Sequence, residues 1–380
     1  MALYSKRLEP LLAYPFAEID RAKREAQTRM RVVDFGVGDP DIHTDKAIQG
    51  ALVAGLAEDS AHKYPSYNGN EKFRRSVARY MLNRWRVKLD PDAEVLSLIG
   101  SKEGIAHLPL AVLNPGDVAC YPDPGYPVYR AGIILAGGEP VALRLREENG
   151  FLPDLEDIPV KAKLVWLNYP NNPTAQTAPK EFWHDAVEHA RERGYLLVND
   201  AAYSEIYYGD RPSGPLAVGG KDVAMEIHSL SKPFSMCGYR VGFAVGSSEA
   251  IFALGALKKN IDSGVFNPIQ DSARAALDNF SELIPPIRKI YSARVKRLHD
   301  ALVEAGWQVF PTNATFYIWA KVPASDTSAD FAKMLIENHG IVTLPGSAMG
   351  DGGEGYIRFS LTLPDEDLEL GIERLREVRL

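Results

Sequence analysis

A lysine flanked by hydroxyl residues and followed by an arginine stands out in residues 229–246, which read S-L-S-K-P-F-S-M-C-G-Y-R-V-G-F-A-V-G. Lys232 has apolar residues or proline close by on each side and no acidic residue within five positions. An amine in such surroundings has a lowered pKa and can act as a nucleophile. Together with Ser229, Ser231 and Arg240 it would suit a cofactor that carries an aldehyde and a phosphate. Taken alone, these residues could equally form a solvated loop between two strands.

A second candidate is the acidic residue Asp200, which directly follows the apolar run 195–199. A carboxylate at the carboxyl end of a buried parallel strand is costly unless it has a charged partner. A protonated pyridine nitrogen would be such a partner, and the pair keeps an aromatic ring able to accept electrons. The alternative for this residue alone is a capped or solvated loop aspartate.

Strands that alternate with helices are expected to position these residues. Short apolar runs predict buried strands at residues 94–99, 118–121, 164–167, 195–199, 223–227 and 241–245. Their alternation with helical patterns favours an α/β fold with an open, mostly parallel sheet between helices. Ligands of such sheets bind beyond the carboxyl ends of the strands, where the candidate residues lie.

Helical patterns cover much of the remaining chain. They are predicted at residues 16–29, 46–57, 71–85, 101–113, 179–193, 254–280 with a break at S-G-V-F-N-P, 287–305 and 328–339. Ser101 suits the N-cap of its helix, where free N–H groups could bind a phosphate. Further strand-like runs at 32–37, 307–310, 315–320 and 356–361 predict a smaller α+β unit. We therefore expect an N-terminal arm with part of a small domain (1–45), a large cofactor-binding domain (46–284) and a small C-terminal domain (285–380).

Composition excludes several classes of function. The chain has 380 residues, 24% of them charged, and a net charge of −7, which argues against nucleic acid as the main partner. Its longest apolar runs fall far short of the roughly 18 residues that a membrane span requires, and no signal peptide is visible. Two cysteines, Cys120 and Cys237, are too few for a disulfide framework or a zinc site, so we expect no metal and a cytoplasmic protein.

The S-x-S-K sequence followed by G-x-R-x-G resembles the lysine motif of the class I/II aminotransferases, which are fold-type I enzymes that use pyridoxal phosphate. The resemblance extends from Gly36 to Arg358. It implies a large α/β domain, a small α+β domain, and a ping-pong transfer of an amino group from an L-amino acid to a 2-oxo acid. It also implies that Lys232 binds the cofactor covalently and moves a proton at the substrate α-carbon, while Asp200 pairs with the pyridine nitrogen.

Other positions match the family's motifs one by one. The resemblance implies that Ser101 and Lys102 bind the cofactor with Ser229, Ser231 and Arg240. Tyr126 would stack over the cofactor ring, although a core tyrosine is an alternative. Asn172 and Tyr203 would hydrogen-bond the phenolic oxygen of the ring. The family's usual glycine after N-Y-P-N-N-P-T is Ala175 here, a small departure.

The resemblance also assigns residues to the substrate and to a partner subunit. Arg358 would bind the substrate α-carboxylate as a bidentate fork, although an arginine in an alternating strand could also face solvent. Gly38 would lie beside the substrate, or serve only the turn. Tyr64, placed five residues before Gly69, would reach the cofactor phosphate of a second copy, so the resemblance implies a homodimer.

The N-terminal residues L-L-A-Y-P-F-A-E-I-D-R-A-K-R-E-A (11–26) and D-F-G-V-G-D-P-D (34–41) are similar to the start of the LL-diaminopimelate aminotransferases. This similarity implies that Tyr14 and Gly38 line the substrate pocket and that Lys102, Tyr126 and Asn172 add polar contacts. The loop at 263–267 has no arginine, which disfavours aspartate as the substrate. We therefore expect transamination between LL-diaminopimelate and 2-oxoglutarate, as a step of lysine biosynthesis.

Several alternatives stay open at this point. The substrate could be aspartate, alanine or an aromatic amino acid. Another fold-type I enzyme, such as a carbon–sulfur lyase or a decarboxylase, would keep the same cofactor residues. The aminotransferase-like half of a DNA-binding regulator is disfavoured because few residues precede the first motif. A nucleotide-binding protein is disfavoured because no G-x-G-x-x-G or G-x-x-x-x-G-K sequence lies on a strand–helix turn.

Overall fold

A seven-stranded sheet forms the centre of the protein, in the order β2-β8-β7-β6-β5-β3-β4. The computed structural model describes residues 3–12 and 17–379. Within this sheet, β8 is antiparallel to both of its neighbours and the other pairs are parallel, which confirms the predicted α/β fold. The strands are β2 (Val95–Leu98), β3 (Val118–Asp123), β4 (Glu139–Arg144), β5 (Ala162–Leu167), β6 (Leu196–Asp200), β7 (Ala224–Ser229) and β8 (Gly242–Gly246).

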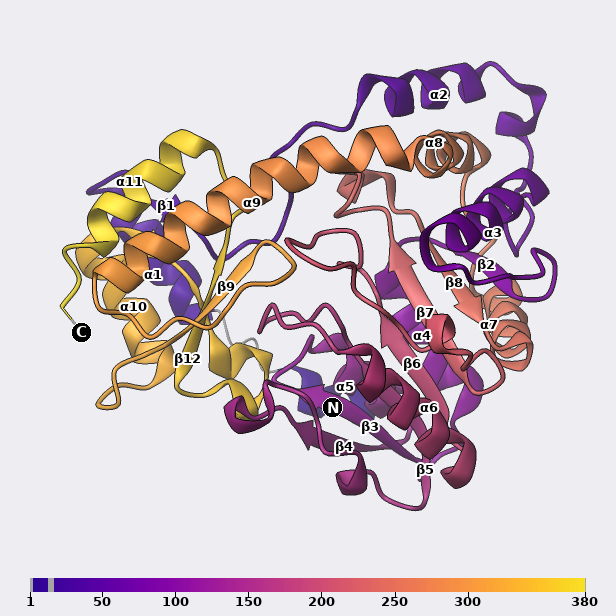
Figure 1. The fold of residues 1–380 in the computed structure, drawn as a ribbon, viewed down its shortest axis with the longest axis horizontal. Helices are drawn as coiled ribbons and strands as arrows, with labels where there is room; N and C mark the ends of the chain where they lie inside the picture. The colour runs from indigo at the N-terminus through magenta and orange to yellow at the C-terminus, as the bar shows by residue number, and fades with distance from the viewer. Residues whose placement is uncertain (1–2, 13–16, 380) are drawn as a thin grey trace.

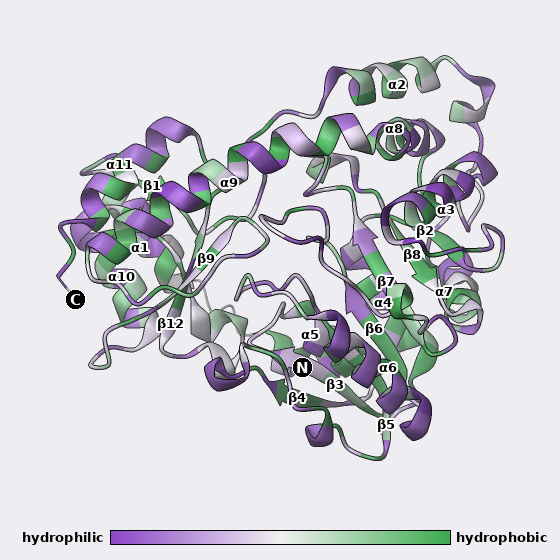
Figure 2. Cartoon of the chain, in the orientation of Figure 1, coloured by the Kyte–Doolittle hydropathy of each residue, from purple (hydrophilic) through white to green (hydrophobic). Residues whose placement is uncertain are grey.

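Helices cover both faces of this sheet, so most of its strands are buried on two sides. Alternate residues of β5 enter opposite cores, Val165 and Leu167 on one face and Leu164 and Trp166 on the other. A strand buried on both faces reads as a continuous apolar run, and Figure 2 draws the central strands largely in green. The helices are α3 (Glu71–Trp85), α6 (Lys180–Arg193) and α8 (Asn267–Asp278) on one face, and α4 (Ser101–Val112), α5 (Val128–Leu135) and α7 (Ser248–Ile261) on the other.

A second hydrophobic core lies in the C-terminal part of the chain, together with the N-terminal helix. It surrounds a three-stranded antiparallel sheet of order β11-β12-β9 and a parallel pair β1–β10. The N-terminal helix α1 packs against α10, with Ile19 and Ile336 in one cluster. The elements are α1 (Ala17–Gln27), β1 (Val33–Asp34), β9 (Tyr317–Lys321), α10 (Ser328–His339), β10 (Ile341–Val342), β11 (Leu344–Pro345), β12 (Tyr356–Ser360) and α11 (Asp365–Leu375).

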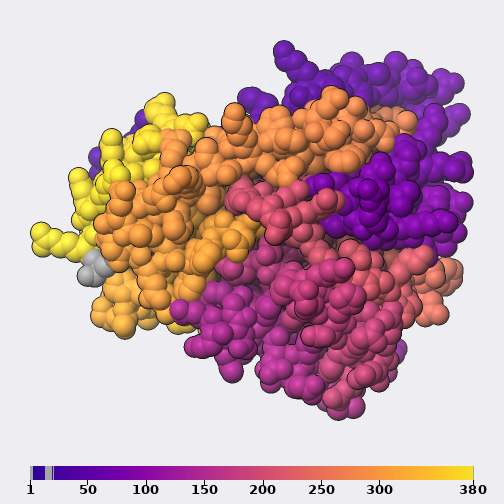
Figure 3. Space-filling model, viewed as in Figure 1, coloured from indigo at the N-terminus to yellow at the C-terminus, as the bar shows by residue number. Residues whose placement is uncertain are grey.

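The long helix α9 (Phe280–Glu304) runs between the two cores, and α2 (Lys46–Leu56) lies over α8 at the other end (Figure 1). The space-filling view shows the C-terminal residues at one end of the molecule and the segments around α2 and α3 at the other (Figure 3). The division of the chain into domains at residues 45 and 284 stays a prediction. In residues 3–12 and 17–379, no helix is both long and apolar enough to span a membrane.

Most predicted elements are confirmed, and the errors have physical reasons. Helices 71–85 and 328–339 begin and end where they were predicted. The helix predicted at 287–305 begins instead at Phe280, with Pro285 and Pro286 inside it, because Ile284 packs into the large core and extends the helix past the prolines. The strand predicted at 307–310 is only an isolated bridge at Val309, and the run 32–37 contains only the two-residue β1. Helices α5 and α11 and the edge strand β4 were missed.

Candidate active site

A cavity of about 520 Å³ lies at the carboxyl ends of β5, β6 and β7. It is the place where an open parallel sheet binds its ligands. Twelve of the candidate residues, from both ends of the chain, line it: Gly38, Ser101, Lys102, Tyr126, Asn172, Asp200, Tyr203, Ser229, Ser231, Lys232, Arg240 and Arg358. The structure therefore brings together residues that the sequence places more than three hundred positions apart.

The amine of Lys232 reaches into this cavity from the turn that follows β7. Its Nζ donates a hydrogen bond to the carbonyl oxygen of Gly38 over 2.6 Å and lies 3.6 Å from the sulfur of Cys237. The backbone of this turn is held by the N–H of Ser231, which donates to Ser229 Oγ over 3.1 Å. The lysine is half-buried, so its amine is accessible to a ligand without being free in solvent.

Asp200 ends β6 with a buried carboxylate that lacks a cationic partner among the described residues. It is 5% exposed, and it accepts hydrogen bonds from the Tyr129 hydroxyl (2.7 Å) and the Ala202 N–H (3.2 Å). Burial raises the pKa of Asp200 to about 6, and these two donors, together with the charge of His228, only partly oppose the effect. No basic side chain in residues 3–12 and 17–379 forms an ion pair with it. A cation bound in the cavity would therefore stabilise the ionised form of Asp200.

A set of donors suited to an anion lies where α4 begins. Gly100, with φ of +77°, is the N-cap, and Ser101 is the first helical residue, so the prediction of Ser101 as N-cap was wrong by one position. The positive φ favours glycine here, and a Cβ would lie 2.4 Å from an Arg240 nitrogen, so the guanidinium would have to move. Gly242 likewise leaves room for the Ser101 N–H, which its Cβ would approach to 3.0 Å. A free N–H at a helix start beside a guanidinium is a typical phosphate site.

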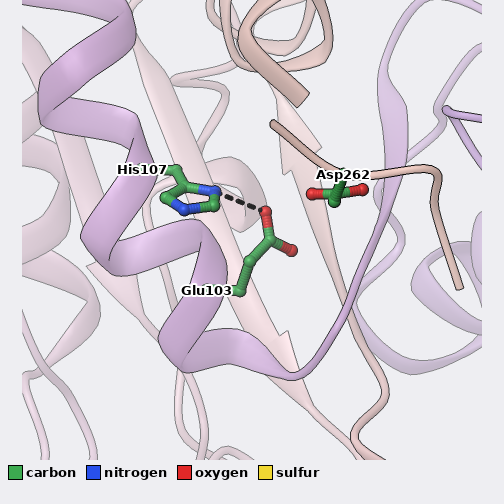
Figure 4. A group of neighbouring side chains, drawn as sticks. All are labelled: Glu103, His107 and Asp262. Atoms are coloured by element: carbon green, nitrogen blue, oxygen red, sulfur yellow. Dashed lines mark hydrogen bonds and ion pairs between the residues drawn. The ribbon is translucent and has the colours of Figure 1, made fainter. Parts of the chain in front are cut away.

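The side chain of Glu103, in the first turn of α4, binds the backbone just before the N-cap. Its Oε2 accepts the Ile99 N–H over 2.9 Å, which fixes the turn before α4. Figure 4 shows Glu103 with His107 and Asp262, whose ligand atoms lie within 4.8 Å of one another, as metal ligands would. The fully buried ammonium of Lys258 lies 3.0 Å from a carboxylate oxygen of Glu103 and of Asp262. The lysine thus supplies the positive charge of this cluster.

Arg358 lines the cavity from β12, a strand of the small antiparallel sheet. The residue is 5% exposed, so it does not face solvent. Its guanidinium donates to Asn172 Oδ1 over 2.6 Å and to the Gly36 carbonyl over 2.9 Å. Its Nε is buried and has no hydrogen-bond partner among the described residues. A buried donor without a partner is costly, and a carboxylate ligand would satisfy it.

Asn172 is held by the turn after β5. Its N–H donates to Asn168 Oδ1 over 2.9 Å, and the Asn168 amide donates to the carbonyl of Asp200 over 2.8 Å. The side chain of Asn168 therefore links the carboxyl ends of β5 and β6. Asn172 lies in the cavity within reach of Arg358 because this turn is fixed.

Four tyrosines complete the walls: Tyr126, Tyr129, Tyr203 and Tyr317. Tyr126 is half-buried and meets the Tyr129 ring edge-on at 5.9 Å; burial raises the pKa of Tyr126 to about 12. The hydroxyl of Tyr203 lies 2.9 Å from that of Tyr317. Burial and, to a smaller extent, the interaction with Tyr317 raise the pKa of Tyr203 well above its usual range, so its hydroxyl stays protonated.

Sequence reasoning missed Tyr129, Asn168 and Tyr317. Asn168 carried a usable signal, because it directly follows the predicted strand 164–167. Tyr129 lies in α5, a helix that was not predicted, and carried none. Tyr317 lies in an apolar strand and carried none.

Two candidate residues do not reach this cavity in a single chain. Tyr64, before α3, is 89% exposed and does not line the cavity. Tyr14 lies outside the described residues. Their roles stay predictions, as do the functional roles of the twelve residues in the cavity.

Comparisons with known proteins agree with this geometry. The family described as aminotransferase class I and II matches residues 30–375. The chain is 48% identical to an LL-diaminopimelate aminotransferase of Aquifex aeolicus over 99% of both chains, and 47% identical to one of Halothermothrix orenii over 97% of both. Among solved structures, substrate-bound BacF from Bacillus subtilis has a TM-score of 0.94 at 32% identity, covering 99% of this chain and 98% of that one. A probable N-succinyldiaminopimelate aminotransferase from Thermus thermophilus has a TM-score of 0.89 at 34% identity, covering 95% and 99%.

Proposed function

The chain belongs to the class I and II aminotransferases, and from this premise we propose that it uses pyridoxal phosphate to exchange the amino group of LL-diaminopimelate with 2-oxoglutarate. The observation that carries the proposal is the composition of the cavity. A lysine amine, a buried carboxylate without a cation and an anion-binding turn lie together, with an arginine opposite them.

Each chemical group of pyridoxal phosphate has a matching group in this cavity. The N-terminus of α4, with Ser101, Ser229, Ser231 and Arg240, fits a phosphate. The buried Asp200 fits a protonated ring nitrogen, which would supply the missing cation. When bound, the cofactor supplies an aldehyde that links to amines and a ring that withdraws electrons from the substrate α-carbon.

The residues around the reacting atoms have separate tasks. Lys232 Nζ would hold the cofactor and, once released, take the proton from the substrate α-carbon as a general base. Asp200 would keep the ring nitrogen protonated. Tyr203 and Asn172 would hydrogen-bond the ring oxygen, and Tyr126 would pack on the ring face.

Arg358 would fix the substrate by its α-carboxylate. Its orientation is set before binding by Asn172 and Gly36, and the free Nε–H leaves an edge of the guanidinium ready for a carboxylate. A fork of two parallel hydrogen bonds gives both affinity and orientation. The same contact would serve the amino acid and the 2-oxo acid, because both carry this carboxylate.

The choice of LL-diaminopimelate is supported by relatives of that name, which are 44–48% identical over nearly the whole chain. A long substrate with a second amino and carboxylate group needs polar partners far from the reacting carbon. Lys102, which is exposed at the cavity, and Tyr126 can provide them, and we assign Tyr14 and Gly38 to the same pocket.

Assembly and cellular role belong to the same proposal. We assign Tyr64 to the cofactor phosphate of a second copy in a homodimer; its 89% exposure in a single chain leaves the side chain free to make this contact. The enzyme would act in lysine biosynthesis in the cytoplasm.

The test is a comparison of kcat/KM for LL-diaminopimelate, aspartate, alanine, phenylalanine and methionine, each with 2-oxoglutarate as acceptor. We expect LL-diaminopimelate to rank first. If any of the other four ranks above it, the substrate proposal fails while the aminotransferase family stands. Release of ammonia or carbon dioxide as the main product would instead indicate a lyase or a decarboxylase.

A further inference from the structure

Tyr317 contacts two of the proposed site residues at once, from the first position of β9. Its hydroxyl lies 2.9 Å from that of Tyr203, and its ring lies 4.0 Å from the guanidinium carbon of Arg358. The side chain is 2% exposed. Its backbone is held by pairing with Ser360 of β12 and by the hydroxyl of Thr315, which accepts the Tyr317 N–H over 3.0 Å. Tyr317 is therefore a fixed group between two functional side chains.

The same hydroxyl explains why residue 38 is a glycine. A Cβ built on Gly38 would lie 2.2 Å from the Tyr317 oxygen, a distance that no real contact allows. The φ of Gly38 is not in the left-handed region, so its backbone would accept alanine. The space that the glycine leaves is thus occupied by Tyr317. The Gly38 carbonyl, in turn, accepts the hydrogen bond from Lys232.

The direction of the tyrosine–tyrosine hydrogen bond follows from counting protons. Each hydroxyl has one proton to donate. If Tyr203 donates its proton to the ring oxygen of the cofactor, it can only accept in its contact with Tyr317. Tyr317 is then the donor, and a hydroxyl that accepts one hydrogen bond becomes a stronger donor in the next.

We propose that Tyr317 is a positioning residue for amino transfer: its hydroxyl orients and strengthens Tyr203 as a donor, and its ring supports Arg358. This inference rests on the proposed function, since it assigns Tyr203 and Arg358 to cofactor and substrate. One side chain would then adjust both the charge of the cofactor ring and the binding of the substrate carboxylate.

The first test separates the hydroxyl from the ring with Tyr317→Phe. The variant is loaded with pyridoxal phosphate, and the absorbance of the bound cofactor is titrated with pH. A less stabilised ring oxygen makes the nitrogen joined to Lys232 more basic, so we expect the midpoint to rise by roughly 0.5 to 1 pH unit, the equivalent of one hydrogen bond. The KM values should stay within about twofold, because the ring still faces Arg358.

Tyr317→Leu removes the ring as well. We expect KM for both the amino acid and the 2-oxo acid to rise by about 5- to 30-fold, the range of a cation–π contact in a desolvated site. A general loss of stability would not separate the two effects, in which Tyr317→Phe shifts the absorbance midpoint and only Tyr317→Leu raises KM. The matched control is Tyr195→Phe, which removes a buried hydroxyl bonded to His189 just before β6, at the opposite end of that strand from Asp200. It should change neither quantity.

A rescue experiment tests the contact itself. Gly38→Ala should shift the midpoint and raise KM, because its Cβ displaces the Tyr317 hydroxyl. In the Tyr317→Phe background the hydroxyl is absent, and the nearest ring carbon lies 3.1 Å from the Cβ. The additional change that Gly38→Ala causes in the midpoint and in KM should therefore be smaller. If Gly38→Ala changes the midpoint and KM equally in both backgrounds, Tyr317 does not fill the space at Gly38, and this part of the inference is overturned.

The charged and titratable side chains near the tyrosine pair are the same in wild type and in Tyr317→Phe: Arg358, Asp200, Tyr126, Tyr129, Tyr291 and Lys232. A midpoint within about 0.2 unit of wild type, well below the shift that one hydrogen bond produces, would therefore refute the role of the hydroxyl. If Tyr317→Phe does not fold, the midpoint of Gly38→Ala decides the same question. If wild type itself binds no pyridoxal phosphate, the proposed function fails, which is a different result.

Discussion

Asp200→Asn is expected to stabilise the cofactor-free protein at neutral pH and to weaken the cofactor-bound protein. The reason is that the carboxylate is buried without a cation until the cofactor supplies one. An asparagine has nearly the same shape and carries no charge. It can accept the Ala202 N–H with its oxygen and donate to the rotated Tyr129 hydroxyl with its amide, so neither neighbour loses its partner.

The magnitude follows from the pKa of Asp200, which burial raises from 3.8 to about 6 in the cofactor-free fold. The shift is about 2 units, or roughly 3 kcal/mol. Because the folded state binds the proton more tightly than the unfolded state, the wild type loses stability as the pH rises from about 4 to about 6, and the whole loss is present above that. Dividing by an unfolding entropy of about 2 cal/mol/K per residue gives a Tm increase of about 4 °C for the variant at pH 8.

The assay is thermal unfolding of both proteins without cofactor at pH 8, 6 and 4.5, followed by titration with pyridoxal phosphate at pH 8. The difference in Tm should narrow as the pH is lowered from 6 toward 4. In the titration the variant is at a disadvantage instead. It should bind the cofactor at least about 100-fold more weakly, which is the cost of losing a buried charged pair. Transamination should fall by orders of magnitude.

Three outcomes would refute this reasoning. A cofactor-free variant that melts below wild type at pH 8 would mean that the carboxylate has a stabilising partner in the fold. An unchanged affinity for pyridoxal phosphate would mean that Asp200 does not face the ring nitrogen. A variant that differs equally at all three pH values would show a packing effect unrelated to charge.

Three further predictions follow from other contacts. Purified protein should be yellow, and borohydride should fix the cofactor on Lys232; a labelled peptide from elsewhere in the chain would remove the assignment. Arg358→Lys should raise KM for amino acid and oxo acid alike, because a point charge replaces a fork; an effect on the amino acid alone would argue against a shared carboxylate site. Lys258→Met should cost about 3–5 kcal/mol in unfolding free energy, because two carboxylates lose their buried cation. Lys221→Met, whose ion pair with Glu94 is 42% exposed on the lysine side, is the control and should cost under about 1 kcal/mol.

The large sheet was predictable because its strands are buried on both faces and therefore read as apolar runs. The edge strand β4 was not, since residues 139–144 are mostly half-exposed and include a proline and two charged residues. Helix α5 was missed because its eight residues are few for a helical pattern to emerge. The start of α9 was misplaced because a local rule about proline was overridden by packing of Ile284.

The candidate site was predictable where a residue follows a buried strand. Asp200 ends β6, and Asn172 and Lys232 come soon after β5 and β7. The carboxyl ends of these parallel strands meet at one edge of the sheet. The family motif then carried the prediction to Arg358, which no rule of strand order could place in this cavity. The arginine arrives there through the packing of a separate antiparallel sheet, a long-range event that local pattern does not encode.

The glycines show the remaining limit most clearly. The sequence marks Gly38 as a turn residue, and a turn is sufficient to explain it. In the structure Gly38 leaves space for the Tyr317 hydroxyl, and Gly100 does the same for the Arg240 guanidinium. A missing side chain says that some atom comes close, but which atom depends on the packing of β9 and of the turn before β8. For that reason Arg240 could be found from its motif, whereas Tyr317 could be found only from the space that Gly38 leaves.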